Sequence, residues 1–385
     1  MSKHNENGDN ILANSSKTVV AQSGAMFSEL PAEVTAAYPS PWAALRVTRA
    51  DIEAEIERLA ELEHAPNSRR ACEIVHPRSR DIGPAVTPGL SVSINVVRPG
   101  EHLELWRDNA TRVEFVLQGE GSASISTATL GMRKWSVISV PSMTRRVYKN
   151  TGKAPLVWLS YSNAPLLQRL GTYYSDNKVS VPRPPLSERS AAEQRYVAKN
   201  APDIAILDAG ARLRGYEFVT DIEVVENKPL LWPWSETSPH LAKEMGDGKR
   251  GLLLLVNPAT GRRQGTTHSF FAALSRSPAG VRRPVPPRGH KHSSFAVNYH
   301  FEGVGESIVD GQHFDWEAGD LMLSAPSWSE HAHGVTGASV LTVQDHPFQM
   351  SIESLIWQEQ MDGPILTLGS EVGQTGYVGP RESGE

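Results

Sequence analysis

The sequence predicts an all-β protein in which two similar barrels follow one another, with a few flanking helices. Short runs of β-branched or alternating residues begin at about residue 85, and Gly or Pro separates them. LSVSINVV, RVEFVLQG and LVWLSYS are examples. A second block of the same character runs from about 250 to 350, and its segments recur in the order of the first block.

The repeat extends over four pairs of segments. SRRACEIVHP (68–77) parallels GKRGLLLLVNP (248–258), with a basic residue seven positions before His76 and before Asn257. RVEFVLQGEG parallels AVNYHFEGVG, PSM parallels PSW, and SNAP parallels QDHP. Conserved order and spacing over four segments indicate a duplicated β-barrel unit.

The 385 residues are enough for two domains and their connections. We expect a disordered tail over 1–35, barrels over 36–174 and 229–360, a polar linker over 175–228 and a tail over 361–385. The best helix covers 48–64, where apolar residues recur at helical spacing and acids occupy the first turn. Those apolar residues are Ile52, Ile56, Leu59 and Leu62.

Composition excludes several classes of protein. Net charge is −5 and no basic block stands out, which argues against a nucleic-acid partner. No stretch approaches 18 apolar residues, and the start lacks the basic and apolar regions of a signal peptide. The single cysteine, Cys72, excludes an intrachain disulfide and a thiolate zinc site, and fits a reducing cytoplasm. Any metal would be held by imidazole, carboxylate or water, which favours iron, manganese, zinc or nickel.

Two His-x-His pairs stand in the second block. His290 and His292 precede the FEGVGE strand, whereas His331 and His333 follow Gly319-Asp320 and Pro326. Residues two apart on a strand face the same side, so three imidazoles can meet inside a small barrel if the two strands are neighbours. Three ligands would leave coordination positions open, as a catalytic metal requires. A lone His-x-His is more often a surface or satisfied pair, but the second pair at this spacing favours a metal site.

The order HxH, EGxG, GD and PxWxxHxH resembles the cupin superfamily, and most closely the gentisate and salicylate dioxygenases, which are iron(II) ring-cleaving enzymes. RGLLLLVNPATG (250–261) is similar to that family's Arg-x6-Asn-Pro segment. Ala296 and Val297 stand where most cupins have a metal-binding glutamate. The resemblance covers most of 230–360 and, more weakly, 40–170. It implies a bicupin of two jelly-roll barrels, assembled as a homotetramer or with a small partner subunit.

The resemblance also implies roles for the site residues. His290, His292 and His331 would hold Fe(II), and His333 would serve as the acid–base group. The alternative is that His333 is the third metal ligand and that His331 contacts the ligands without binding the metal itself. Asp345 falls where the family has an acidic residue and would orient an imidazole; it could instead be a turn carboxylate before Pro347.

Substrate contacts are less determined. Arg250 would clamp a carboxylate through its planar fork, or is a solvated arginine next to Lys249. Asn298 replaces the family's second carboxylate-binding arginine, so a hydroquinone, an aminophenol, or an amino- or nitro-substituted benzoate fits as well as gentisate. The pocket would be lined by Phe271, Ser275 and Trp328, although both aromatic residues could be core residues.

The first copy departs from this pattern. Trp106, Asp108 and approximately Arg146 match the three ligand histidines, and that set cannot coordinate a metal. We expect the first barrel to be structural, whereas the well-known relatives carry their metal there.

The leading hypothesis is therefore a ring-cleaving dioxygenase that uses a small aromatic substrate and O2. One alternative is a cupin isomerase, lyase or decarboxylase with another divalent metal. The other is a non-catalytic bicupin that binds a small molecule.

Overall fold

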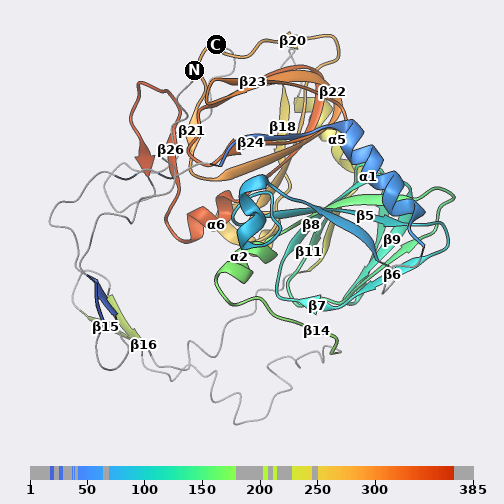
Figure 1. The fold of residues 1–385 in the computed structure, drawn as a ribbon, viewed down its shortest axis with the longest axis horizontal. Coiled ribbons are helices and arrows are strands. Elements are labelled where there is room, and N and C mark those ends of the chain that lie inside the picture. Colours follow the sequence, from blue (N-terminus) through green and yellow to red (C-terminus); the bar gives the residue numbers. More distant parts are fainter. Residues whose placement is uncertain are drawn as a thin grey trace.

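The computed structural model describes two β-barrels that lie side by side (Figure 1). The described residues are 42–63, 69–178, 228–244 and 250–367, together with the short pieces 18–20, 26–28, 37, 39, 203–206 and 211–214. The prediction of an all-β chain with few helices is confirmed.

The first barrel packs a six-stranded sheet against a four-stranded sheet. In spatial order, the larger sheet contains β17 (Leu230–Trp232), β11 (Val137–Val140), β8 (Arg112–Gln118), β13 (Leu156–Ser162), β5 (Ser91–Val97) and β4 (Arg70–Ile74). The smaller sheet contains β10 (Ala128–Arg133), β9 (Glu120–Ile125), β12 (Arg146–Asn150) and β6 (His102–Leu105). Side chains from both sheets, including Val116, Ile125 and Trp158, form one buried cluster.

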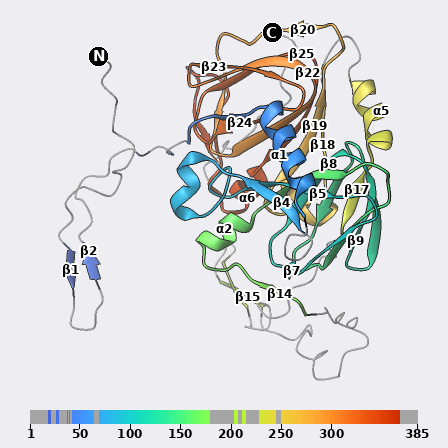
Figure 2. The ribbon, with the colours of Figure 1, turned by 45° about the vertical axis from the view of Figure 1, so that its right-hand side comes forward.

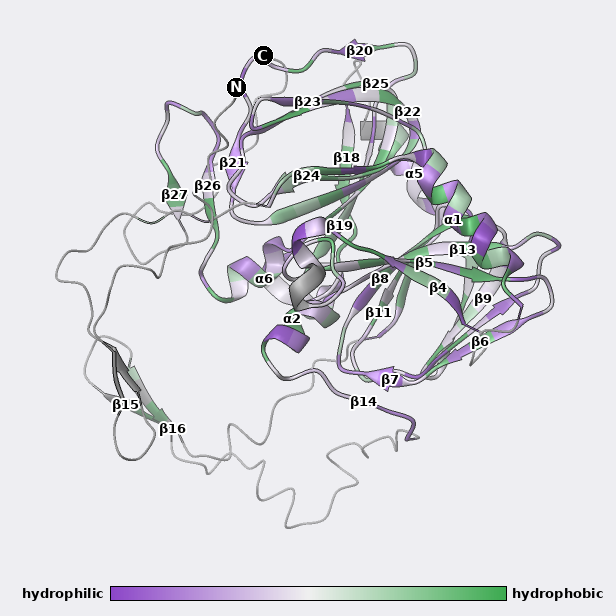
Figure 3. Ribbon diagram, viewed as in Figure 1, coloured by the Kyte–Doolittle hydropathy of each residue, from purple (hydrophilic) through white to green (hydrophobic). Residues whose placement is uncertain are grey.

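The second barrel is built around two long strands, β22 (Phe295–Val309) and β25 (His331–Gln344). The main path of its sheet is β18 (Gly251–Leu254), β19 (Phe271–Arg276), β25, β22, β24 (Leu321–Pro326) and β3 (Leu45–Val47). Two further strands, β20 (Arg282–Arg283) and β23 (Gln312–Glu317), pair with β25 and β22. Hydrophobic residues colour strands such as β13 and β24 green in Figure 3.

A repeated glycine explains part of the duplicated sequence pattern. Gly119 and Gly303 have positive φ angles of 82° and 76°, where the two barrels depart from regular strand geometry. A Cβ atom at Gly119 would lie 2.4 Å from the carbonyl oxygen of Pro155, and one at Gly303 would lie 2.5 Å from that of Gly337. Only glycine tolerates both the backbone conformation and the close approach.

Each barrel is completed by a strand from a distant part of the chain. Strand β3, from the N-terminal side of the first barrel, pairs with β24 of the second barrel. Strand β17, which precedes the second barrel in sequence, pairs with β11 of the first. Sheet membership therefore crosses the boundaries expected at 36–174 and 229–360.

Helix α1 (Arg49–Glu61) follows β3 and confirms the helix expected over 48–64. Thr48 and Asp51 form a reciprocal capping box at its start, and Ile52 and Leu59 are buried. The fully buried carboxylate of Asp320 accepts hydrogen bonds from the backbone N–H of Arg49 (2.7 Å) and from Nε of Arg46 (2.8 Å). This contact fixes β3 and the start of α1 to the second barrel.

The barrels share a continuous apolar core. Phe115 of the first barrel lies against Tyr299 and Phe301 of the second, with ring centroids 5.8 and 5.4 Å apart. Ile52 and Leu59 belong to the same cluster, and Figure 2 shows α5 (Trp234–Glu244) beside the second barrel. The two halves are thus one packed unit.

The remaining described elements are short. They are the helical segments η2 (Pro77–Ile82), α2 (Ala164–Arg169), η5 (Pro258–Arg263) and α6 (His346–Ser351), and the strands β1 (Thr18–Val20), β2 (Met26–Ser28), β7 (Arg107–Asp108), β14 (Ser175–Asp176), β15 (Asp203–Ile206), β16 (Ala211–Arg214), β21 (Lys291–His292), β26 (Ile356–Gln358) and β27 (Leu366–Thr367). Most of the tail expected over 1–35, and much of 175–228 and 361–385, lies outside the described residues. Among the helices described, none has the length and apolar character needed to cross a bilayer.

Candidate metal centre

The three predicted ligand histidines converge inside the second barrel. Their ring nitrogens lie within 4.8 Å of one another, and His292 and His331 are buried. His290 and His331 exchange two backbone hydrogen bonds, of 3.2 and 3.0 Å, and their ring centroids are 4.4 Å apart. The bridge between the two residues is what brings the two histidine motifs together.

Backbone carbonyls orient two of the imidazoles. Nδ1 of His292 donates to the carbonyl oxygen of Ser294 (2.8 Å), and Nδ1 of His331 donates to that of Ser329 (2.9 Å). A carbonyl oxygen can only accept, so these contacts fix the tautomer and turn Nε2 of each ring toward the centre of the triad.

Asp345, expected to orient an imidazole, makes different contacts. Its carboxylate accepts from the backbone N–H of Phe295 (2.6 Å) and from Nε2 of Gln349 (3.4 Å). Burial raises its pKa to about 6, although those hydrogen bonds favour the charged form. Asp345 also stands immediately before α6, so these contacts are those of a turn carboxylate.

The donor set fits a first-row divalent metal. Three imidazole nitrogens suit iron, manganese, zinc or nickel, and three ligands leave positions for substrate. The only thiol, that of Cys72, lies on β4 of the first barrel, and burial raises its pKa to about 12. A second group, Glu306, His313 and Asp315, lies on the surface of the described region, where acidic clusters without a metal are common.

Two residues that sequence reasoning did not select contact the triad. Trp357 of β26 pairs with His292 in register and stacks on His290, with ring centroids 5.4 Å apart and planes 10° apart. The amide Nε2 of Gln344 donates to Nε2 of His292 over 2.9 Å. Gln344 therefore lies on the side of His292 that faces the triad, and its only signal in the sequence was its place in QDHP.

The triad lies in the wall of a cavity of about 200 Å³. Five of the predicted residues line the cavity: His333, Arg250, Asn298, Phe271 and Ser275. Trp328 is nearly buried and is not among the described residues that line it. Nδ1 of His333 lies 2.9 Å from the hydroxyl oxygen of Ser307, and its ring centroid lies 5.7 Å from that of His331.

Asn298 is held on both sides of its amide. Nδ2 donates to the hydroxyl of Ser324, and the hydroxyl of Thr342 donates to Oδ1, each over 2.8 Å. This cavity wall therefore presents a fixed, neutral amide where the resemblance would place an arginine.

His300, two residues beyond Asn298, also lines the cavity. Its ring is buried and stacks on Trp316, with centroids 3.7 Å apart. Within the described part of the chain neither ring nitrogen has a hydrogen-bond partner. Burial, followed by the charge of Arg46, lowers the pKa of His300 to about 3.

Replacing His300 with leucine is expected to reduce the acid sensitivity of the fold. The unfolded chain binds a proton near pH 6.5 and the folded chain only near pH 3. The folded state therefore loses stability as the pH falls through this window, by about 1.4 kcal/mol per pH unit. Urea unfolding at pH 7, 6 and 5 should show a shallower decline for the variant than for the wild type. The exposed His102→Leu variant is the control, and parallel declines for all three proteins would contradict the expectation.

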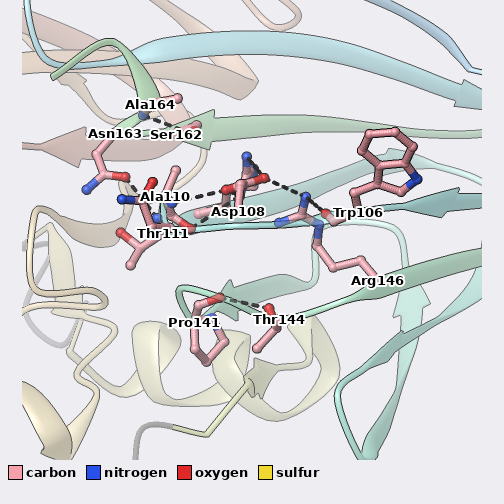
Figure 4. Close-up of polar contacts among 12 residues, drawn as sticks. Trp106, Asp108, Ala110, Thr111, Pro141, Thr144, Arg146, Ser162, Asn163 and Ala164 are labelled. Carbon is pink, nitrogen blue, oxygen red and sulfur yellow. Dashed lines mark hydrogen bonds and ion pairs between the residues drawn. The ribbon is translucent and has the colours of Figure 1, made fainter. Parts of the chain in front are cut away.

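The first barrel has no equivalent triad among its described residues. Asp108 and Arg146, which match His292 and His331, form an ion pair of 2.9 Å (Figure 4). Arg112 pairs with the same carboxylate over 2.7 Å. Trp106, which matches His290, is exposed. The order of elements is retained, because β7 pairs with β14 as β21 pairs with β26.

Comparison with known proteins supports the predicted resemblance. No family model matches the chain. It is 27% identical over 275 residues to a 1-hydroxy-2-naphthoate 1,2-dioxygenase of Nocardioides sp. (strain KP7), covering 68% of this chain and 63% of that protein, which is less than two thirds of its length. It is 24% identical over 308 residues to a 5-aminosalicylate 1,2-dioxygenase of Comamonas sp., covering 76% of this chain and 74% of that protein.

The solved structures give the fold. The salicylate 1,2-dioxygenase of Pseudaminobacter salicylatoxidans superposes with a TM-score of 0.65 at 17% identity, over 82% of this chain and 88% of that one. The chain is a bicupin that resembles the gentisate and salicylate dioxygenases, as the sequence predicted.

Proposed function

We propose that the protein is an Fe(II)-dependent ring-cleaving dioxygenase that uses O2 to open a gentisate-like aromatic compound. The substrate class comprises dihydroxy-, amino- or nitro-substituted benzoates and hydroquinones. The observation that carries the proposal is the triad of His290, His292 and His331, two of them buried, in the wall of a cavity. Similarity to proteins named as aromatic 1,2-dioxygenases supports the reaction type.

A ferrous ion in the triad would supply adjacent open positions for the substrate and for O2, and a path for electrons between them. Residues of the protein would move protons and exclude water at the site. His333 lies close enough to His331 to exchange a proton with a substrate hydroxyl, while Ser307 holds its Nδ1 side. Trp357 covers one face of His290 and keeps water from that side of the site.

Arg250 would bind the carboxylate of the substrate. It is exposed, lines the cavity, and precedes β18, whose Leu252 and Leu254 are also exposed lining residues. The carboxylate would therefore lie toward the open side of the cavity, and the ring would lie between Phe271 and the fixed amide of Asn298.

The size of the cavity favours one aromatic ring over two fused rings. Its volume of about 200 Å³ lies below the range of roughly 300–1,000 Å³ that is usual for ligand pockets. A small cavity suits the monocyclic benzoates and hydroquinones proposed here, and the bicyclic substrate named for the naphthoate relative provides the comparison that tests this size limit.

The test is oxygen consumption by iron-loaded protein with gentisate, 5-aminosalicylate, hydroquinone and 1-hydroxy-2-naphthoate. We expect stoichiometric O2 uptake with at least one monocyclic compound, and kcat/KM at least about 10-fold lower for the naphthoate. Metal-free protein that still turns over substrate, or activity that persists without oxygen, would refute the dioxygenase.

An Arg250→Gln variant separates substrate binding from chemistry. We expect KM for carboxylated substrates to rise about 10-fold or more, because a charge-assisted hydrogen bond is lost, while hydroquinone, which has no carboxylate, is unaffected. Equal effects on both compounds would assign Arg250 to the solvated surface.

The homotetramer, with or without a small partner subunit, and the cytoplasmic location remain part of this proposal. They follow from the family resemblance and from the single cysteine.

A further inference from the structure

The first barrel contains a cavity of its own, with a volume of about 330 Å³. It lies on the strands equivalent to those that surround the triad, and it is lined by Asp108, Arg112 and Arg146. Arg69, at its mouth, precedes β4 as Arg250 precedes β18. The duplication has therefore kept a lumen and an arginine at its mouth after the metal ligands were replaced.

Arg146 stands at the position of a metal ligand and has spare hydrogen-bonding capacity. Its side chain is 3% exposed, and its Nη2 donates to the carbonyl oxygen of Trp106 (3.0 Å) and to Asp108 (2.9 Å) (Figure 4). Its Nε and Nη1 have no partner among the described residues. Buried charged donors without an acceptor are costly, so an acceptor in the adjacent lumen would stabilise the barrel.

The charged side chains that line the cavity are of both signs. Arg69, Arg112 and Arg146 lie among the carboxylates of Glu73, Glu104, Asp108 and Glu114. Although burial disfavours its charge, Arg112 and Arg146 hold the pKa of Asp108 below its usual value. Burial raises the pKa of Glu114, which accepts a hydrogen bond from the hydroxyl of Tyr148 (2.5 Å), and also that of Glu73. Asp108 is paired with both Arg112 and Arg146, and Glu104 is paired with Arg145. The unpartnered nitrogens of Arg146 are therefore the donors that this lumen offers to an anion.

The other wall of the cavity offers neutral hydrogen-bonding groups. Ser91, Ser93 and Asn95 of β5 and Ser160 and Ser162 of β13 line it. In the second barrel, lining positions on the equivalent strands β19 and β25 include Phe271, Ala273 and Val340. The first lumen is therefore suited to a ligand that carries hydroxyl groups as well as negative charge.

We propose that the first barrel binds a small hydroxycarboxylate, with the guanidinium of Arg146 standing where the second barrel would hold its metal ion. The carboxylate accepts from Nε and Nη1 of Arg146 and from Arg69 at the mouth, and the serine wall binds the hydroxyl groups. The site is separate from the triad and does not depend on the proposed ring cleavage.

The test is isothermal titration calorimetry of the full-length, iron-loaded protein with malate, and with the uncharged diamide malamide as the matched control ligand. We expect one malate per chain, no binding of malamide, and a malate-dependent rise in melting temperature. Arg146→Met should abolish binding. Arg69→Gln, at an exposed position, should weaken binding about 10-fold or more and leave ring cleavage unchanged. If Arg146→Met does not fold, the Arg69→Gln comparison decides the question.

Malate also chelates metal ions, so the titration is repeated with His331→Ala. Binding should persist there, because the triad is not the site. No binding by the wild type up to tens of millimolar malate, unchanged binding in Arg69→Gln, or loss of binding in His331→Ala would each overturn the proposal.

Discussion

Replacing His331 with alanine is expected to remove stoichiometric metal from the protein and to lower oxygen consumption by at least about 10³-fold. In the proposed site the imidazole would supply one of three ligands, and a catalytic metal contributes several kcal/mol to a rate. His331 itself is buried and Trp357 is stacked on His290, so the two remaining histidines have no neighbouring ligand to take the place of the lost imidazole among the described residues that form the metal-binding group. Metal analysis together with an oxygen electrode measures both effects.

His313→Ala is the matched control for this experiment. His313 is exposed on β23, belongs to the surface group with Glu306, and should leave metal content and activity unchanged. His333→Ala should retain the metal and lose activity, since His333 is proposed to move a proton. If His333→Ala loses metal and His331→Ala keeps it, the assignment of the third ligand is reversed.

Replacing Asp320 with alanine is expected to lower the free energy of unfolding by about 3–5 kcal/mol. Its carboxylate is fully buried and accepts from Arg46, from the backbone N–H of Arg49 and from that of Glu317. Its removal leaves two backbone N–H groups and the Arg46 side chain, which is 31% exposed, without their charged acceptor. Each hydrogen bond to a charged group contributes about 1.5–3 kcal/mol, so their combined loss is large even though solvent reaches Arg46. Urea unfolding followed by circular dichroism gives the free energy.

Asp315→Ala is the control for this stability measurement, because the Asp315 side chain is 83% exposed. It should change the unfolding free energy by less than about 0.5 kcal/mol. An Asp320→Ala variant as stable as this control would mean that β3 and α1 are held to the second barrel by apolar packing alone.

The sequence was sufficient to predict the triad. His290, His292 and His331 lie in short motifs on strands, and the spacing between the motifs is that of a barrel hairpin. Strand alternation determines which side chains point inward, and the repeat revealed two copies of the same unit. The three histidines that cluster in the structure could therefore be selected from the order of residues alone.

The residues around the triad could not be predicted, because a shift of a single residue along the chain decides which way a side chain points. Gln344 is the last residue of β25 and faces His292, whereas Asp345, the next residue, begins the turn into α6. A shift of one residue along a strand reverses the face of the side chain. Trp328 follows Ser327, which has a positive φ of 72°. Serine rarely adopts this conformation, so nothing in the sequence indicated the turn that directs Trp328.

Trp357 was missed for a different reason. It reaches the site from β26, which lies beyond the last repeated segment and pairs with the short strand that holds His292. Only the assembled tertiary structure brings these elements together.

Strand β3 pairs with the second barrel and strand β17 pairs with the first, so each barrel depends on the other half of the chain for one of its strands. If the chain were cut between the halves, each barrel would lose the strand that the other half supplies, and neither half would form a complete sheet. The barrel whose described residues include no histidine triad can therefore not be removed without disrupting the barrel that has one. This exchange of strands gives a physical reason why the first barrel is retained although it has no equivalent triad among its described residues. Its interior side chains can then change and serve a different function.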